Sequence, residues 1–214
     1  IDFDSDILFQ KVGYCKQMEG DIEGALKDYL HADLINPDSK WVIKHIAACY
    51  RSLKKPQEAL TYYRRYEALN PDNLSIQISI GNCLLELKDY NEAIKCFFKV
   101  DYLDHKRHKA WRPIAWCSFL TGKYDQAKNY YKKILDNKPN AQDLLNAGHT
   151  EWALQNIKGA LSYYQQVVQK EDGDFNKFQD LFNQDIPDLL VAGIETPEIT
   201  LMLEQLRYKI SGDL

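Results

Sequence analysis

The sequence predicts an all-α protein, a solenoid of about five helix-turn-helix repeats followed by a C-terminal helical cap. Alanines recur every 34 residues and then after 33, at Ala25, Ala59, Ala93, Ala127 and Ala160. An aromatic ring follows each of them by four positions, at Tyr29, Tyr63, Phe97, Tyr131 and Tyr164. A small residue lies in each expected first helix, at Gly13, Ala47, Gly81, Ala115 and Gly148. A fixed period of this length is typical of stacked repeat arrays, in which neighbouring repeats share one core.

Each of these positions has a physical role in a pair of packed helices. Small residues on both helices allow the backbones to approach closely, and the ring fills the space beside the crossing. The alanine and the ring are four residues apart, so they share one helical face. Prolines near the ends of the second helices turn the chain into the next repeat, at Pro37, Pro71 and Pro139. We expect repeats near residues 6–39, 40–73, 74–107, 108–140 and 141–171, within an array spanning residues 1–171.

Two regions depart from the repeat. Pro113 lies in the expected first helix of the fourth repeat, so we expect that helix to begin near Ala110, where the first N–H groups have no partner anyway. Beyond Glu171 the pattern decays, and we expect residues 172–214 to form a degenerate sixth repeat whose helices cap the apolar end of the stack. Pro187 is expected to interrupt this cap. A partner-binding helix is the alternative role for the segment.

Composition excludes several classes of function. The chain has 214 residues, of which 45% are hydrophobic and 27% charged, as in soluble folded proteins. Its net charge of −4 argues against a nucleic-acid binder, because such proteins carry a basic surplus. No apolar run approaches the roughly 20 residues that span a bilayer. The chain begins Ile1-Asp2 without a methionine, so we expect a piece of a longer protein, and an upstream targeting signal stays open.

Four of the five cysteines occupy one equivalent repeat position, at Cys15, Cys49, Cys83 and Cys117. Equivalent positions in stacked helices lie roughly 8–10 Å apart, which is too far for a disulfide. A linear series also does not converge on one point, as a metal site requires. We therefore expect small buried hydrophobic residues in a reducing compartment, which indicates a cytoplasmic location.

The pattern of small residue, alanine, aromatic ring and proline resembles the tetratricopeptide repeat family over about residues 6–170. The resemblance implies a right-handed α-α superhelix whose first helices line a concave face where ligands lie. The positions that it assigns to this groove are Tyr14, Trp41, Lys44, Arg51, Asn82, Lys109, Arg112, Trp116, Phe119, His149 and Trp152. The charged members are all basic, and Trp and Arg are frequent anchors of binding hot spots. The alternative for the rings is packing between neighbouring repeats.

The prediction is thus a non-catalytic scaffold that binds a protein or peptide with acidic and hydrophobic side chains in a basic groove. Some members of the family clamp a chaperone's terminal carboxylate, but Ala48, Ser79 and Pro113 stand where that clamp needs polar or basic residues. No phosphate loop, nucleophile motif or paired carboxylate predicts an enzyme, and no cofactor or metal is expected. The alternative function is a self-associating or regulatory segment of a longer multidomain protein.

Overall fold

The computed structural model describes residues 5–104 and 108–212, which form twelve α-helices and no strand. The predicted all-α class is therefore confirmed. The chain divides into two compact units, Ile1–Asp104 and His105–Leu214. The first unit holds α1 (Asp6–Glu19), α2 (Ile22–Ile35), α3 (Lys40–Ser52), α4 (Pro56–Leu69), α5 (Leu74–Glu86) and α6 (Tyr90–Leu103). The second holds α7 (Trp111–Leu120), α8 (Tyr124–Leu135), α9 (Ala141–Ala153), α10 (Ile157–Lys170), α11 (Phe175–Val191) and α12 (Thr196–Ser211).

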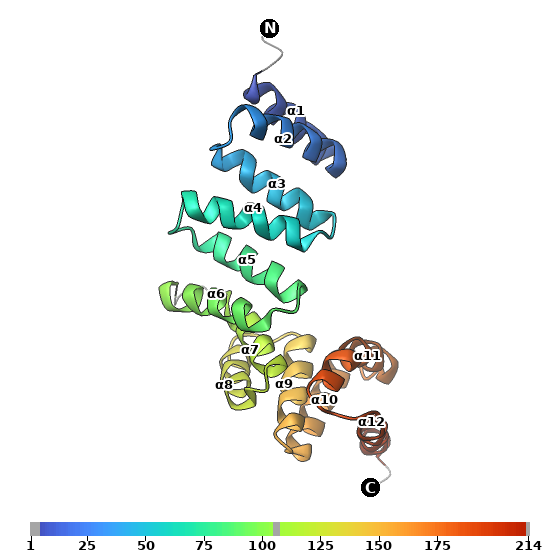
Figure 1. Ribbon diagram of the computed structural model, residues 1–214. Coiled ribbons are helices and arrows are strands. Elements are labelled where there is room, and N and C mark those ends of the chain that lie inside the picture. Colours follow the sequence, from blue (N-terminus) through green and yellow to red (C-terminus); the bar gives the residue numbers. More distant parts are fainter. Residues whose placement is uncertain (1–4, 105–107, 213–214) are drawn as a thin grey trace. The chain divides into compact units, whose positions relative to one another are not determined.

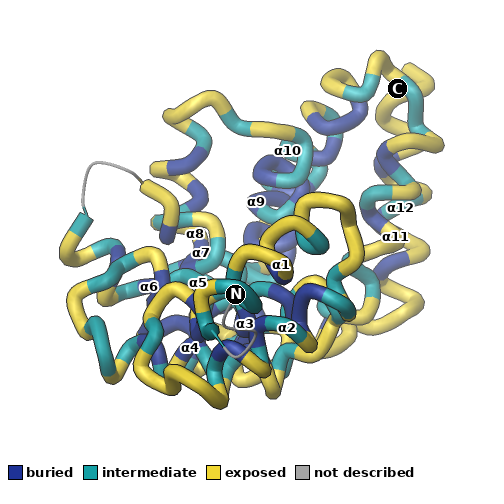
Figure 2. Tube along the Cα trace, turned by 90° about the horizontal axis from the view of Figure 1, so that it is seen from above, coloured by how far each residue is buried: buried dark blue, intermediate teal, exposed yellow. Residues whose placement is uncertain are grey.

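Helices follow one another in sequence order within the first unit, from α1 to α6 (Figure 1). Within this unit each odd-numbered helix packs against the helix that follows it, and α2 and α4 also pack against the first helix of the next pair. Buried residues alternate with more exposed ones along α2 to α6, so these helices are amphipathic (Figure 2). α10 contacts both α11 and α12, so packing continues across residue 171. The predicted boundary between the repeat array and the cap at this residue stays a prediction.

The turn between the two helices of a repeat contains one residue with a left-handed backbone. This residue recurs at the repeat interval, at Gly20, Lys54, Lys88, Gly122 and Gln155, with φ between 59° and 89°. Glycine adopts this conformation without a steric penalty. For lysine and glutamine the left-handed conformation costs about 1–2 kcal/mol of free energy at the same position. The side chains of Asp21, Asp89 and Asn156 then accept backbone N–H groups at the starts of the following helices, which specifies where those helices begin.

Contact between a small residue and an aromatic ring holds each helix pair together. A Cβ atom added to Gly81 would lie 2.6 Å from the ring of Phe97, and one added to Gly148 would lie 2.4 Å from that of Tyr164. Both rings are fully buried. The rings therefore occupy space that any larger side chain on the first helix would need.

The cysteine position is buried in three repeats and open in the first. Cys49, Cys83 and Cys117 are 0% exposed, as predicted, whereas Cys15 is exposed, so the prediction is wrong for that residue. The helix preceding Cys49 explains the difference, because α2 packs onto that side of α3. Among the described residues, no preceding helix covers the same side of α1, and Val12 on that side is 38% exposed.

The two prolines behave differently from one another. Pro113 lies in the first turn of α7, which begins at Trp111, so the expected late start is confirmed. Pro187 lies inside α11 and does not interrupt it, which contradicts the expected break. The physical reason is that a proline removes one backbone hydrogen bond, while the buried side chains of Phe178, Phe182 and Leu189 anchor the helix on both sides.

Replacing Gly81 with alanine is expected to lower the free energy of unfolding by about 1–2 kcal/mol, because the new methyl group overlaps the ring of Phe97. The higher helix propensity of alanine acts in the opposite direction by up to about 1 kcal/mol. Urea unfolding measures the net effect. The penalty should shrink when the substitution is made in a Phe97→Leu background, and a stabilised single variant would contradict the contact.

A thiol reagent at pH 8 is expected to modify Cys15 rapidly and the buried cysteines only after unfolding. Burial raises the pKa of Cys49 and of Cys83 to about 11 and that of Cys117 to about 12, so their reactive thiolates are scarce. Mass spectrometry of the native protein after brief labelling checks this. Rapid modification of Cys49 would contradict the packing of α2 on α3.

Candidate protein-interaction surfaces

An aromatic cluster lies on the first helices of the first unit. The rings of Trp41 and His45 on α3 stack with centroids 3.7 Å apart, and Tyr14 on α1 lies 6.3 Å from Trp41. A nitrogen of His45 hydrogen-bonds the backbone oxygen of Trp41 at 2.7 Å. Burial lowers the pKa of His45, so its ring is neutral near pH 7. The cluster is thus a neutral, rigid aromatic platform.

Part of this platform is accessible to a partner. Tyr14 is 47% exposed and Trp41 is 40% exposed, although large aromatic side chains are usually more deeply buried. Both border an open hollow of about 530 Å³, whose other lining residues are Ile7, Gln10, Lys11 and Cys15. Lys44 is exposed on α3, one turn from both Trp41 and Ala48. The surface therefore combines apolar rings with lysine charges.

Arg51 and Asn82, also predicted for the groove, have more limited roles. Arg51 on α3 lies 3.8 Å from the carboxylate of Glu86 on α5, and both side chains are partly exposed. Such a long exposed pair contributes little to stability, so the guanidinium can still bind another anion. Asn82 is partly buried on α5.

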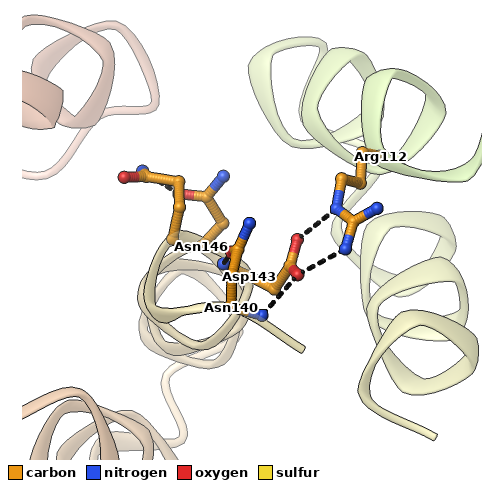
Figure 3. Close-up of polar contacts among 5 residues, drawn as sticks. Arg112, Asn140, Asp143 and Asn146 are labelled. Carbon is orange, nitrogen blue, oxygen red and sulfur yellow. Dashed lines mark hydrogen bonds and ion pairs between the residues drawn. The ribbon is translucent and has the colours of Figure 1, made fainter. Parts of the chain in front are cut away.

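In the second unit, Arg112 is held by a carboxylate. Its Nε donates to Asp143 Oδ1 at 2.7 Å and a terminal nitrogen donates to Oδ2 at 2.8 Å (Figure 3). Asp143 also accepts the backbone N–H of Asn140 at 2.9 Å, and the Asn140 side chain accepts the N–H of Asp143, which caps α9. This two-fold bridge joins α7 to the start of α9. Arg112 therefore links the two helices, and its predicted place in the groove stays a prediction, since its side chain is 55% exposed.

Three of the predicted groove residues are buried. Phe119 and His149 are 0% exposed and Trp152 is 4% exposed. His149 contacts Tyr164 Oη at 2.8 Å through Nδ1 and lies 3.3 Å from Asp185 of α11 through Nε2. α11 covers this side of the unit, and its Phe182 contacts the rings of both His149 and Trp152. These three residues pack in the core, so we leave them out of the proposed contact surfaces.

The two other predicted residues of this unit are accessible to different degrees. Trp116 is partly buried and stacks on Phe119 with centroids 5.2 Å apart. Lys109, just before α7, is exposed. The acids Glu86 and Asp143, which were not predicted, lie on first helices and pair with the predicted arginines. Their repeat positions could have revealed them, because each lies on a first helix close to the predicted groove residues.

These features define the general class of the protein, which is a helical-repeat protein. Family models agree with it. The model of anaphase-promoting complex, cyclosome, subunit 3 matches residues 25–100, and a tetratricopeptide repeat model matches residues 114–141. The predicted resemblance to tetratricopeptide repeat proteins is therefore confirmed. Proteins with such repeats act as protein-interaction scaffolds and are typically non-catalytic.

Solved structures share the fold at low sequence identity. MamA from Desulfovibrio magneticus RS-1 is 16% identical with a TM-score of 0.74, covering 80% of this chain and 97% of its own. YrrB, described as a TPR protein with an unusual peptide-binding site, is 17% identical with a TM-score of 0.71, covering 80% and 89%. PilF from Pseudomonas aeruginosa is 19% identical with a TM-score of 0.62, covering 95% and 97%. No curated protein matches significantly.

The described residues contain no group of three or more His, Cys, Asp or Glu side chains arranged to hold a metal ion. None of the helices in the described ranges is long and apolar enough to cross a membrane.

Replacing Arg112 with alanine is expected to lower the free energy of unfolding by about 1–2 kcal/mol, because the buried carboxylate of Asp143 loses two charged hydrogen bonds. Chemical denaturation measures the loss. Arg51→Ala is the matched control and should cost less than about 0.5 kcal/mol, since its partner is partly exposed. Equal losses for the two variants would contradict a structural role specific to Arg112.

Proposed function

We propose that this protein is a non-catalytic scaffold that binds a peptide segment of a partner on the first helices α1, α3 and α5. The observation that carries the proposal is the exposure of Tyr14 and Trp41, which lie side by side at the hollow on α1 and α3. Exposed aromatic rings that are already ordered bind with little loss of conformational entropy. The peptide-binding site named for YrrB, a structural relative, agrees with such a role.

The charges near these rings indicate the chemistry of the peptide. Lys11 lines the hollow and Lys44 is exposed beside Trp41, whereas the same part of the surface has no acid among its lining residues. Arg51 extends the basic character further along α3. A segment with aliphatic or aromatic side chains for the hollow and carboxylates for the lysines fits this surface best. Lys109 and Trp116 are the corresponding accessible candidates of the second unit.

A second candidate function is self-association, and exposed apolar side chains on α1 favour it. Ile7 and Met18 on this helix are 56% and 71% exposed. Apolar side chains grouped on one helix are a frequent feature of interfaces. Light scattering over a range of concentrations distinguishes this function, because only self-association raises the apparent mass.

All five cysteines are free thiols, which agrees with a reducing, cytoplasmic location.

Peptide binding is tested with a panel of labelled peptides that combine Leu or Phe with Glu, each compared with its Gln counterpart. We expect the acidic peptides to bind, and Trp41→Ala combined with Lys44→Glu to weaken binding at least tenfold, which is about 1.4 kcal/mol. Fluorescence anisotropy measures the affinity, and circular dichroism confirms folding.

The matched control places similar changes on a second helix. Tyr102→Ala combined with Lys95→Glu removes an exposed ring and a lysine from α6, and affinity should stay within about twofold of wild type. An equal loss in both variants, or unchanged binding by the Trp41 and Lys44 variant, would remove the proposed surface.

A further inference from the structure

Charge is distributed very unevenly within the second unit. Residues 108–140 hold seven Lys and Arg but only two acids, Asp125 and Asp136, in a protein whose net charge is −4. Residues 141–212 hold eleven acids and five basic residues. The basic surplus thus belongs to one helix pair, α7 and α8, together with the loops that flank it. Charge asymmetry of this kind favours a surface for a partner of the opposite sign.

Most of this surplus lies on α8 and beside it. Its exposed lysines are Lys123, Lys128, Lys132 and Lys133, which we call the α8 basic surface. Lys133 lies 4.4 Å from the centre of the Tyr130 ring and 5.6 Å from that of Trp111, so its ammonium is held between two rings. Lys132 forms no ion pair with any residue in the described part of the chain. At least one ammonium group is therefore available to an external carboxylate.

A hollow adjoins the α8 basic surface. It has a volume of about 340 Å³ and is bordered by Lys128 and Lys132 of α8, Ala147 and Glu151 of α9, and Tyr163 of α10. Lys128 lies 2.9 Å from the carboxylate of Glu151, whose side chain is 9% exposed. Asn156 also donates to Glu151 at 2.7 Å, so this carboxylate keeps a partner when Lys128 turns toward another anion. The hollow thus has room for an apolar side chain of a partner, between two lysines and a tyrosine.

We propose that the α8 basic surface is a second docking site, which binds an extended acidic segment of a partner protein. Side chains four residues apart on a helix lie roughly 6 Å from one another, which is the spacing of Lys128 and Lys132. Alternate side chains of an extended peptide repeat at nearly the same distance, about 6.6 Å. Carboxylates at every second position therefore pair with both lysines, and an apolar side chain of the same segment enters the hollow.

The size and charge of the surface favour a short acidic peptide over other polyanions. α8 has twelve residues and is about 18 Å long, which matches five or six extended residues. The acidic residues 141–212 of the same unit repel a long polyanion such as a nucleic acid or an anionic membrane. This inference does not depend on the α1–α3–α5 surface, because none of its residues belongs to that surface.

The test uses a fluorescein-labelled ten-residue peptide with Glu at alternate positions, Ser between them and one central Leu in place of a Glu. Anisotropy should show saturable binding that weakens as salt rises, and the Gln counterpart of the peptide should bind at least tenfold more weakly. Lys128→Gln combined with Lys132→Gln should also weaken binding at least tenfold. Glutamine keeps a donor for Glu151, and Lys132→Gln alone serves if the double variant is less stable.

Lys95→Gln combined with Lys99→Gln is the matched control, because these lysines have the same spacing on another second helix and Lys95 also has a carboxylate partner, Glu92. All variants in this test carry Trp41→Ala, so that the α1–α3–α5 surface does not bind the same peptide, and in this background the Lys95 and Lys99 variant should bind as its parent does. Unchanged binding by the Lys128 and Lys132 variant would overturn the proposal. The choice of partner would be overturned if an RNA oligonucleotide or phosphatidylserine vesicles bound as tightly as the peptide or more tightly. It would also be overturned if the wild-type protein formed a dimer that the Lys128 and Lys132 variant did not form.

Discussion

The contact between a small residue on one helix and a ring on the next is the constraint on which the rest of the structure depends. At Gly13, Gly81 and Gly148 the ring of the partner helix lies within 2.9 Å of the place where a Cβ atom would be. Two helices that approach this closely exclude water and bury an aromatic ring between them. These rings set the distance between paired helices, and the next helix then packs on the pair, as α2 does on α3 where Cys49 is buried.

Once the helix pairs are formed, the surfaces that remain are free to vary, and their differences carry the proposed functions. On α3 the variable positions hold Trp41 and Lys44 beside Tyr14 of α1, which makes an aromatic and basic surface. On α7 the comparable arginine is bound by Asp143 of α9, so it links two neighbouring repeats. α8 concentrates lysines next to a hollow. The same scaffold therefore supports distinct surfaces on its first and second helices.

The sequence predicted the fold well because the repeat positions report local packing, which recurs with the same geometry in each helix pair. The start of α7 near Pro113 and the burial of Cys117 followed from this local argument. Site residues were harder to predict, since a position on a first helix does not reveal what covers it. His149 and Trp152 have groove positions, but α11 packs over them through Phe182. Arg112 has the charge expected of a groove residue, but its charge is already satisfied.

The amino-acid sequence by itself determined the helix pairs, their period and the residues at their crossings, because these depend on side-chain size and on spacing along one helix. Only the tertiary structure decided which of the repeated positions face solvent and which charges stay available. Cys15 is exposed while its counterparts are buried, and Pro187 remains helical because buried side chains hold α11 on both sides of it. Such outcomes depend on the neighbouring helix, which lies close in space but is not encoded in the local pattern.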